Sequence, residues 1–227
     1  VAANNAPVII GEDVAEDLID TGCVNPADPT QPASAFVPYD VRAKLWSDGA
    51  EKHRAMAIPD GTTVTLDAEG DFIYPVGSVL YKDFWINGKI IETRLLMHRQ
   101  EGDGSKWEGF SYEWNAEQTE AELVEGGKTT TIDGQEWNFP SKIQCNACHT
   151  DAAKKALGPE VAQLNHEFLY ESSGTTANQL LTLEAIDYLS APLGDTNSLV
   201  SMPDPFDESA DEGERARAYL HANCSGC

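Results

Sequence analysis

The chain has few basic residues, and this shortage sets the first limits on its function. Lysine and arginine together number 15, against 38 aspartate and glutamate residues, which gives a formal net charge of −23 at pH 7. A surface with this charge repels nucleic acid and anionic membranes and favours basic partners. We therefore expect no nucleic-acid partner.

Long apolar runs are also missing. No stretch approaches the ~20 consecutive apolar residues of a membrane-spanning helix, so no membrane span is expected. The first residues, VAANNAPVII, lack a charged region followed by an apolar one, and we expect any export signal to have been removed. The 227 residues, 41% of them hydrophobic, suffice for one large domain or two small ones.

Turn signals and periodicity divide the chain into segments. PDG, AEGD, NGK, EGDGS and EGGK separate short runs such as SVLYKDFWI and KIIETRLLMHR, which favour strands. Apolar residues three and four apart in PEVAQLNHEFLY and ANQLLTLEAIDYLS favour helices. The predicted fold class is α+β, with an antiparallel β-rich N-terminal domain followed by a helical segment. The segments are a loop-rich N-terminus (1–35), a β-rich domain (36–140), a helical segment (141–190), a proline-rich linker (191–208) and the first helix of a further module (209–227).

The motif QCNACHT carries the most specific chemistry. Cys145 and Cys148 stand at the spacing that suits thioether bonds to the two vinyl groups of a haem, and His149 follows as a proximal iron ligand. The motif therefore predicts one covalent haem c, and residues 141–190 become a haem-binding segment.

Three other kinds of site share parts of this motif. A zinc site needs four ligands, and the second C-x-x-C lies 76 residues away. A thioredoxin-like dithiol requires a helix that begins just after a strand of a βαβ unit. A simple disulfide leaves His149 without a role. Haem c is the favoured reading.

The chain closes on ANCSGC, which repeats the spacing with Cys224 and Cys227 but without a histidine. A helix before it places Ala216, Leu220 and Cys224 on one stripe. We expect residues 209–227 to begin a second, truncated cytochrome c-like module. A second haem at Cys224 and Cys227 is possible only if the chain continues.

An electron-transfer haem needs a sixth ligand, and Met97 is the preferred candidate. Met97 and His98 are adjacent on a predicted strand, so alternation sends them to opposite faces. His98 is the alternative, and ordinary core packing is the competing explanation for Met97. The other methionines and histidines that could supply this ligand are Met56, Met202, His53, His166 and His221. The sequence LGP at 157–159 is typical of a loop in which the proline carbonyl orients the proximal histidine.

Several long motifs carry a family resemblance. WSDGAEKHRAMAIPDG, YPVGSVLYKDFWI, GFSYEWNAEQTEAEL, WNFPSKIQCNACHT and LGPEVAQLNHEF resemble a family of uncharacterised bacterial secreted c-type cytochrome-domain proteins. The resemblance runs from about residue 16 to residue 227. It implies a second C-x-x-C-H after the helix that ends in Cys224, and this chain departs from it by stopping at Cys227. It also implies electron-transfer partners such as a quinoprotein dehydrogenase or another cytochrome.

The sequence therefore predicts an extracytoplasmic c-type cytochrome, periplasmic or extracellular, that transfers one electron at a time through covalent haem. It is more an electron carrier than a catalyst, and it can form oligomers. One alternative is a haem enzyme with an open distal site and peroxidase- or oxidase-like chemistry, for which His98 and Arg99 would be the distal pair. Another is a β-domain binding module with accessory haem, which requires exposed tryptophans. Cys23 is the odd cysteine, either free or paired with a cysteine outside this sequence.

Overall fold

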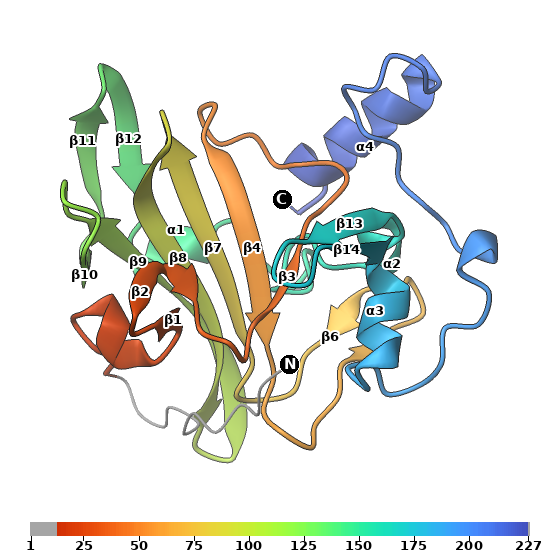
Figure 1. The fold of residues 1–227 in the computed structure, drawn as a ribbon, viewed down its shortest axis with the longest axis horizontal. Coiled ribbons are helices and arrows are strands. Elements are labelled where there is room, and N and C mark those ends of the chain that lie inside the picture. The colour runs from red at the N-terminus through yellow and green to blue at the C-terminus, as the bar shows by residue number, and fades with distance from the viewer. Residues whose placement is uncertain (1–12, 227) are drawn as a thin grey trace. The chain divides into compact units, whose positions relative to one another are not determined.

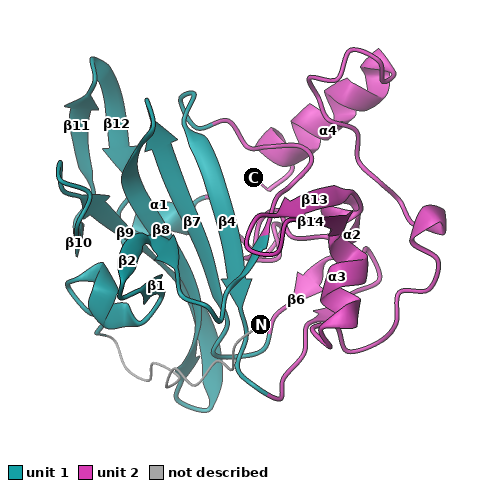
Figure 2. Cartoon of the chain, viewed as in Figure 1, with its two compact units in different colours: residues 1–38, 47–60, 75–147 teal, residues 39–46, 61–74, 148–227 magenta. Residues whose placement is uncertain are grey.

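The computed structural model describes residues 13–226, which form two compact units built from interleaved segments (Figure 2). Unit 1 comprises residues 1–38, 47–60 and 75–147, and unit 2 comprises residues 39–46, 61–74 and 148–227. The C-x-x-C-H motif is divided by this boundary, because Cys145 belongs to unit 1 whereas Cys148 and His149 belong to unit 2.

Unit 1 is built on a six-stranded sheet with the order β10-β9-β8-β7-β4-β3 (Figure 1). The strands are β3 (Val37–Tyr39), β4 (Glu51–Ala57), β7 (Val79–Ile86), β8 (Lys89–Glu101), β9 (Gly104–Trp114) and β10 (Ala121–Leu123). From β4 to β10, each strand pairs antiparallel with the next in this order. The predicted turn NGK joins β7 to β8 in a hairpin, and Asn87 and Gly88 both have positive φ (50° and 75°), as a type I′ turn requires.

Smaller elements of unit 1 flank the sheet. They are η1 (Leu18–Thr21), the hairpin of β1 (Val24–Asn25) and β2 (Asp28–Pro32), the hairpin of β11 (Lys128–Ile132) and β12 (Gln135–Phe139), and α1 (Lys142–Cys145). The segment predicted as a loop-rich N-terminus thus contains, in its described residues, a 3₁₀ turn and the β1–β2 hairpin.

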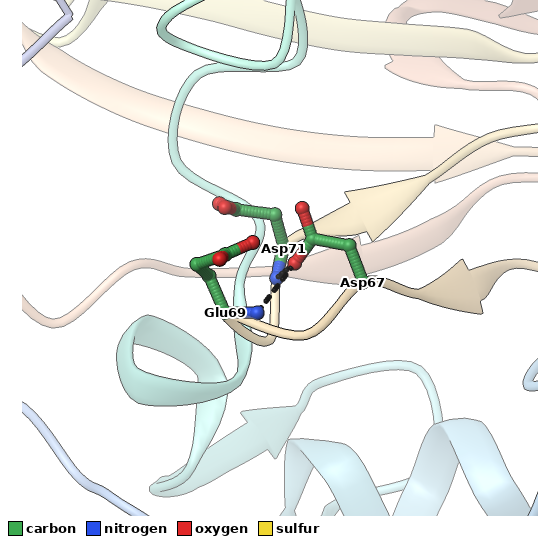
Figure 3. A group of neighbouring side chains, drawn as sticks. All are labelled: Asp67, Glu69 and Asp71. Atoms are coloured by element: carbon green, nitrogen blue, oxygen red, sulfur yellow. Dashed lines mark hydrogen bonds between the residues drawn. The ribbon is translucent and has the colours of Figure 1, made fainter.

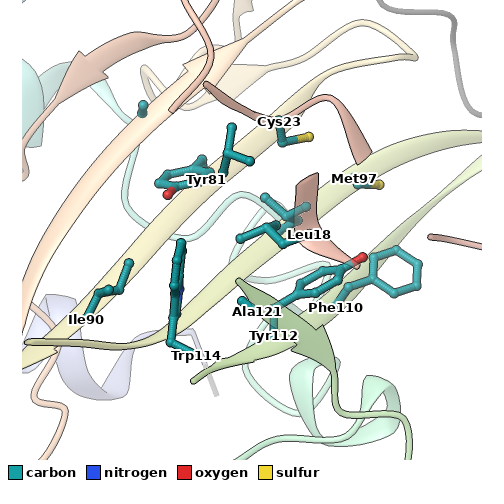
Figure 4. Packing of buried hydrophobic residues seen from close by; sticks show 12 residues of the cluster. Leu18, Cys23, Tyr81, Ile90, Met97, Phe110, Tyr112, Trp114 and Ala121 are labelled. Atoms are coloured by element: carbon teal, nitrogen blue, oxygen red, sulfur yellow. The ribbon is translucent and has the colours of Figure 1, made fainter. Parts of the chain in front are cut away.

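Both faces of the sheet bury apolar side chains. One cluster, shown in Figure 4, includes Leu18, Tyr81, Met97 and Tyr112. A second cluster includes Phe84 and Trp137, and their rings pack edge to face at 5.5 Å. Tyr81 and Phe84 lie three residues apart on β7, so the two clusters occupy opposite faces.

Unit 2 contains short elements joined by long connections. They are β5 (Thr65–Leu66), β6 (Phe72–Ile73), α2 (Val161–Leu164), β13 (Glu167–Tyr170), β14 (Thr175–Asn178), α3 (Gln179–Ala185), η2 (Thr196–Ser198) and α4 (Glu212–Cys224). Two buried glutamines tie the segments together. Gln163 accepts from and donates to the backbone of Ala43 (2.8 and 3.1 Å), and Gln179 does the same with Asp40 (2.8 and 2.9 Å).

The predicted fold class was wrong about the helical segment. Strands make up 37% of the structure and helices 16%, so the protein is β-rich. Residues 141–190 contain three short helices and the β13–β14 hairpin rather than the helical core of a cytochrome c module. The periodicity misled because Phe168 and Tyr170 also fit strand alternation, with Leu169 half exposed between them. The turn at Gly174, with φ of 65°, then reverses the chain.

The predicted C-terminal helix exists as α4, but its buried face is different. Ala218 is buried, whereas Ala216, Leu220 and Cys224 are all exposed. Cys227 lies outside the described residues. Among the residues that the structure describes, no helix is long and apolar enough to cross a membrane.

Candidate functional site

The first cysteine of the motif ends a capped helical turn. Ser141 Oγ accepts from the backbone N–H of Gln144 (3.3 Å), and Gln144 Oε1 accepts from the N–H of Ser141 (2.8 Å), which is a capping box. Cys145 is the last residue of this helix and donates its N–H to the Ser141 carbonyl at 3.0 Å. A redox dithiol places its reactive cysteine at a helix N-terminus instead, so this position does not suit that reading.

An ion pair attaches α1 to the sheet. The ammonium of Lys142 contacts the carboxylate of Glu108 on β9, which also pairs with Arg99 at 2.8 Å and Lys106 at 3.3 Å. Burial acts to raise the pKa of Glu108, but the hydrogen bonds from Lys142 and Lys106 and the charge of Arg99 hold that pKa below its ordinary value. The ionised carboxylate therefore anchors the helix that carries Cys145.

Cys145 lies directly on the backbone of β9 at Gly109. A Cβ atom at Gly109 would stand 2.7 Å from both Cβ and Sγ of Cys145, and 3.8 Å from Cδ1 of Leu96. Gly109 is the register partner of Leu96, so Cys145 covers the sheet face to which Leu96 points. Glycine is required here because any side chain would occupy the place of the thiol.

The ring of His149 is oriented by a backbone carbonyl in unit 2. Nδ1 lies 2.5 Å from the carbonyl oxygen of Lys155. Because a carbonyl oxygen only accepts, Nδ1 carries the proton, and in a neutral ring Nε2 then holds the lone pair. A metal-ligating histidine has this arrangement, in which the hydrogen bond fixes the tautomer and the ring plane. The carbonyl that orients the His149 ring is therefore that of Lys155, not the predicted one of Pro159. The Pro159 carbonyl instead accepts from the backbone N–H of Phe72.

The loop after His149 is folded by unusual backbone conformations. Lys154, Lys155 and Leu157 have φ values of 49°, 61° and 50°, a left-handed region that non-glycine residues rarely adopt. The N–H of Lys155 donates to the Thr150 carbonyl at 2.9 Å, which brings its carbonyl back to the His149 ring. Such strain is concentrated at functional sites.

The two C-x-x-C sequences meet within unit 2. Thr150 Oγ1 donates to the carbonyl of Gly226 at 2.7 Å. A Cβ atom at Gly226 would lie 3.7 Å from the Cys148 carbonyl oxygen. The segment after Cys224 thus lies against the loop that carries His149, although 76 residues separate the motifs.

This proximity does not gather metal ligands among the described residues. Their only group of three or more potential ligand atoms within 4.8 Å of one another is Asp67, Glu69 and Asp71. The thiols of Cys148 and Cys224 are exposed and free. A Cys145–Cys148 disulfide is therefore not formed in this structure.

Met97 lies in the core of unit 1. Its side chain is 2% exposed and packs in the cluster of Figure 4 with Tyr81 and Leu95. Because Leu96 faces Cys145, alternation directs Met97 to the opposite side of the sheet. This packing favours the core-filling explanation for Met97.

His98 lies on the same face as Gly109 and has several partners. It stacks on Trp107 with ring centroids 4.6 Å apart, and its Nδ1 and Nε2 lie 3.1 Å from the Pro75 carbonyl and 2.9 Å from Ser105 Oγ. Arg99 instead pairs with Glu108 and is buried. The two side chains therefore do not form the distal pair of a haem enzyme, because neighbouring strand residues face opposite sides.

The other candidate ligands are engaged in packing, hydrogen bonds or ion pairs within the protein. Met56 is buried, and His53 packs on Trp85 at 5.4 Å. His166 lies 3.0 Å from Gln179 Nε2, and His221 pairs with Glu160 at 2.7 Å.

The tryptophans do not form an exposed platform. Trp114 and Trp137 are buried, Trp85 and Trp107 are partly buried, and Trp46 alone is exposed, at 64%. This distribution gives no support to a ligand-binding aromatic surface on the β domain.

An acidic turn not considered in the sequence analysis lies between β5 and β6 (Figure 3). Asp67 Oδ1 accepts from the backbone N–H groups of Glu69 (2.9 Å) and Asp71 (3.0 Å). The hydrogen bond from Lys154 lowers the pKa of Asp67, whereas burial raises the pKa of Asp71. The turn is thus held together by its own backbone and by Lys154.

Comparison with known proteins gives no relative. No protein-family model, no curated protein and no solved structure matches the chain. Function is therefore inferred from the C-x-x-C-H motif and the residues around it.

Sequence reasoning identified the motif but missed what positions it. Gly109 and the Lys155 carbonyl both matter through contacts that the local pattern does not reveal. The signal available for Gly109 was a glycine inside a strand pattern, which marks a close approach of another group.

Proposed function

We propose that this protein is an extracytoplasmic c-type cytochrome, periplasmic or extracellular, that transfers electrons singly to partner proteins. Haem c is bound through Cys145 and Cys148, with His149 as the proximal ligand. The observation that carries the proposal is the hydrogen bond from His149 Nδ1 to Lys155, which supports Nε2 as the ligand atom.

The residues present fit such a group. Cys148 presents a free, exposed thiol, and Cys145 is held at a fixed place by the capping box and the Lys142–Glu108 ion pair. When bound, haem supplies a one-electron Fe(III)/Fe(II) couple. The chain's own contribution is to fix the histidine ring and to hold the first thiol against the sheet.

Met97 and His98 both remain candidates for the distal ligand. His98 shares the face of Cys145, but a bond to iron would replace its contact with Ser105. Met97 would have to leave the core. A second haem at Cys224 and Cys227 remains a prediction that depends on chain beyond this sequence.

Expression behind an export signal, in a host with c-type haem maturation, tests the proposal. After denaturation, the intact mass of the wild type should include one haem. The Cys145→Ser, Cys148→Ser double variant should carry none, whereas Cys224→Ser, which changes an exposed cysteine of the other C-x-x-C sequence, should retain it. Retention of haem by the double variant would contradict the proposal.

The ligand role of His149 needs a separate readout. His149→Ala should keep the thioether-bound haem but change its ferric absorption spectrum and spin state. His166→Ala is the control and should leave the spectrum unchanged. An unchanged spectrum in His149→Ala would remove this residue from the iron.

A further inference from the structure

A cavity lies at the edge of the sheet in unit 1, where β10 stops. Leu123 is the last residue of β10 and pairs with Tyr112 of β9. Further along β9, Gly109 and Phe110 line a cavity of about 180 Å³ that opens to solvent. Cys145 rests on Gly109, so the cavity lies beside the proposed haem anchor.

The walls of the cavity are largely apolar. Its apolar lining residues are Val14, Phe110, Leu123 and Val124. Val14 and Leu123 also pack against the cluster of Figure 4, and Val124 packs against the second cluster. The core therefore holds the walls in place. Because a cavity of ~150 Å³ admits a molecule the size of benzene, this one suffices for a single side chain.

Two carboxylates accompany these walls. Asp13 and Glu125 line the cavity and are exposed to solvent. Backbone groups fix both segments, because Arg99 donates to the Asp13 carbonyl at 3.4 Å and the Val124 N–H donates to the Ser111 carbonyl at 2.8 Å. Among the described residues, neither carboxylate forms an ion pair. Their two negative charges are therefore available to a cation from outside.

Lys142 also lines the cavity, but its charge is already engaged. Its ammonium contacts Glu108 and lies 5.1 Å from the centroid of the Phe110 ring. The whole group of ion pairs comprises Arg99, Lys106, Lys142, Glu101 and Glu108. Three cations and two carboxylates leave this group with one positive charge, against the two negative charges of Asp13 and Glu125. One further cation would balance the charges around the cavity.

An exposed apolar side chain lies next to the cavity in the sequence of α1. Ile143 follows Lys142 and is 83% exposed. A small amine from solution would leave Ile143 in water, whereas a protein that inserts a side chain into the cavity would cover it. The surroundings therefore favour a protein as the source of the cation.

We propose that this cavity receives a lysine side chain of a basic redox partner. This inference rests on the proposed function. The apolar walls suit the aliphatic stem of a lysine, whose charged end stays at the solvent side, where Asp13 and Glu125 accept from it. A lysine suits the place better than an arginine because its compact ammonium sits on an unbranched, flexible stem. Docking here brings the partner next to the haem bonded at Cys145.

The probe for this site is hexalysine, titrated with the exported, haem-loaded protein at low ionic strength. Fluorescence anisotropy of the labelled peptide measures the dissociation constant. The Asp13→Asn, Glu125→Gln double variant should weaken binding by about three- to tenfold, because exposed ion pairs contribute modestly. The matched control is Glu117→Gln, Glu136→Gln, which removes two exposed carboxylates elsewhere in unit 1. It changes the net charge equally and should alter binding less than about twofold.

Two further measurements locate the peptide. A carbodiimide joins an amine to a carboxylate with which it is in contact, and peptide mapping should find the hexalysine cross-links at Asp13 and Glu125. Val14→Phe narrows the cavity without changing the charge and should weaken binding to a similar extent. Unchanged binding in Val14→Phe would show that the net charge alone attracts the peptide, and would overturn the inference.

The outcomes separate this inference from the proposed function. If the wild type carries covalent haem but the two double variants bind hexalysine equally, the cavity is not the lysine site, and the proposed function still stands. A wild type without covalent haem would overturn the proposed function. Cross-links at Asp13 and Glu125 in that protein would still support the cavity as a lysine site.

Discussion

At the residue scale, Gly109 leaves the space on β9 that Cys145 occupies, so the proposed thioether at Cys145 should depend on it. An added methyl would stand 2.7 Å from the Sγ atom of Cys145, closer than nonbonded atoms can approach. Gly109→Ala should therefore displace Cys145 and lower the yield of covalent haem several-fold, with a stability cost of about 1–3 kcal/mol. Haem staining per unit of folded protein measures this.

The control lies on the same strand. At Gly104 an added Cβ would make only ordinary contact, 3.7 Å from the Glu101 carbonyl oxygen. Gly104→Ala should leave the haem yield unchanged. Equal yields in the two variants would show that Cys145 does not need the bare backbone of β9.

A buried carboxyl on β7 makes stability depend on pH. Asp83 is 2% exposed and accepts from Tyr81 Oη (2.9 Å) and Thr93 Oγ1 (2.5 Å). Burial raises the pKa of Asp83 from 3.8 to about 7, which the hydrogen bonds from Thr93 and Tyr81 oppose. Because the folded state holds the proton more tightly, this stabilising contribution is complete below pH ~4 and is lost as pH rises through about 7.

Asp83→Asn should remove that dependence. In the wild type, the free energy of unfolding falls by at most about 4 kcal/mol for a pKa that moves from 3.8 to about 7. Urea unfolding at pH 5 and pH 8 should show the variant gaining stability relative to the wild type at the higher pH. A constant difference at the two pH values would refute the assignment.

At the element scale, the four-residue helix α1 relies on its capping box. Ser141→Ala removes the acceptor for the Gln144 N–H and should cost ~1 kcal/mol in the free energy of unfolding. Haem attachment should fall as well, because Cys145 loses its fixed position. The matched control is Asn178→Ala, which removes the cap of α3 at a similar cost and should leave attachment intact. Parallel effects on attachment would mean that general stability, not the position of Cys145, governs it.

The elements differ in how far the sequence revealed them. The strand SVLYKDFWI was predicted within a residue of its observed ends, because turn residues bound it and tertiary context agrees with its propensity. The helix expected over 159–170 stops after Leu164, since Phe168 pairs in the β13–β14 hairpin instead. Short apolar runs fit both periods, and only the partner strand decides between them.

Only the part of the site that lies within one short segment could be predicted from the sequence. C-x-x-C-H spans five residues, so its chemistry is visible in the sequence. Gly109 and Cys145, in contrast, are 36 residues apart and meet because α1 packs on β9. A one-residue slip in the register of β9 would send the bare backbone to the other face, which is why the pattern alone could not predict this contact.

At the scale of the whole molecule, the net charge of −23 should control encounters with redox partners. The reduced protein should be oxidised faster by cationic tris(phenanthroline)cobalt(III) as salt is lowered, and more slowly by anionic ferricyanide. Stopped-flow rates at several ionic strengths measure this. The two dependences should flatten at high salt, where the Debye length falls to ~3 Å at 1 M. Rates independent of salt would show that the global charge does not act at the electron-transfer surface.

Covalent haem is tested by an absorption spectrum of the exported wild-type protein together with haem staining of a denaturing gel. We expect a sharp α-band on reduction with dithionite and a stained band that survives denaturation. A colourless protein, or haem lost on the gel, would contradict it.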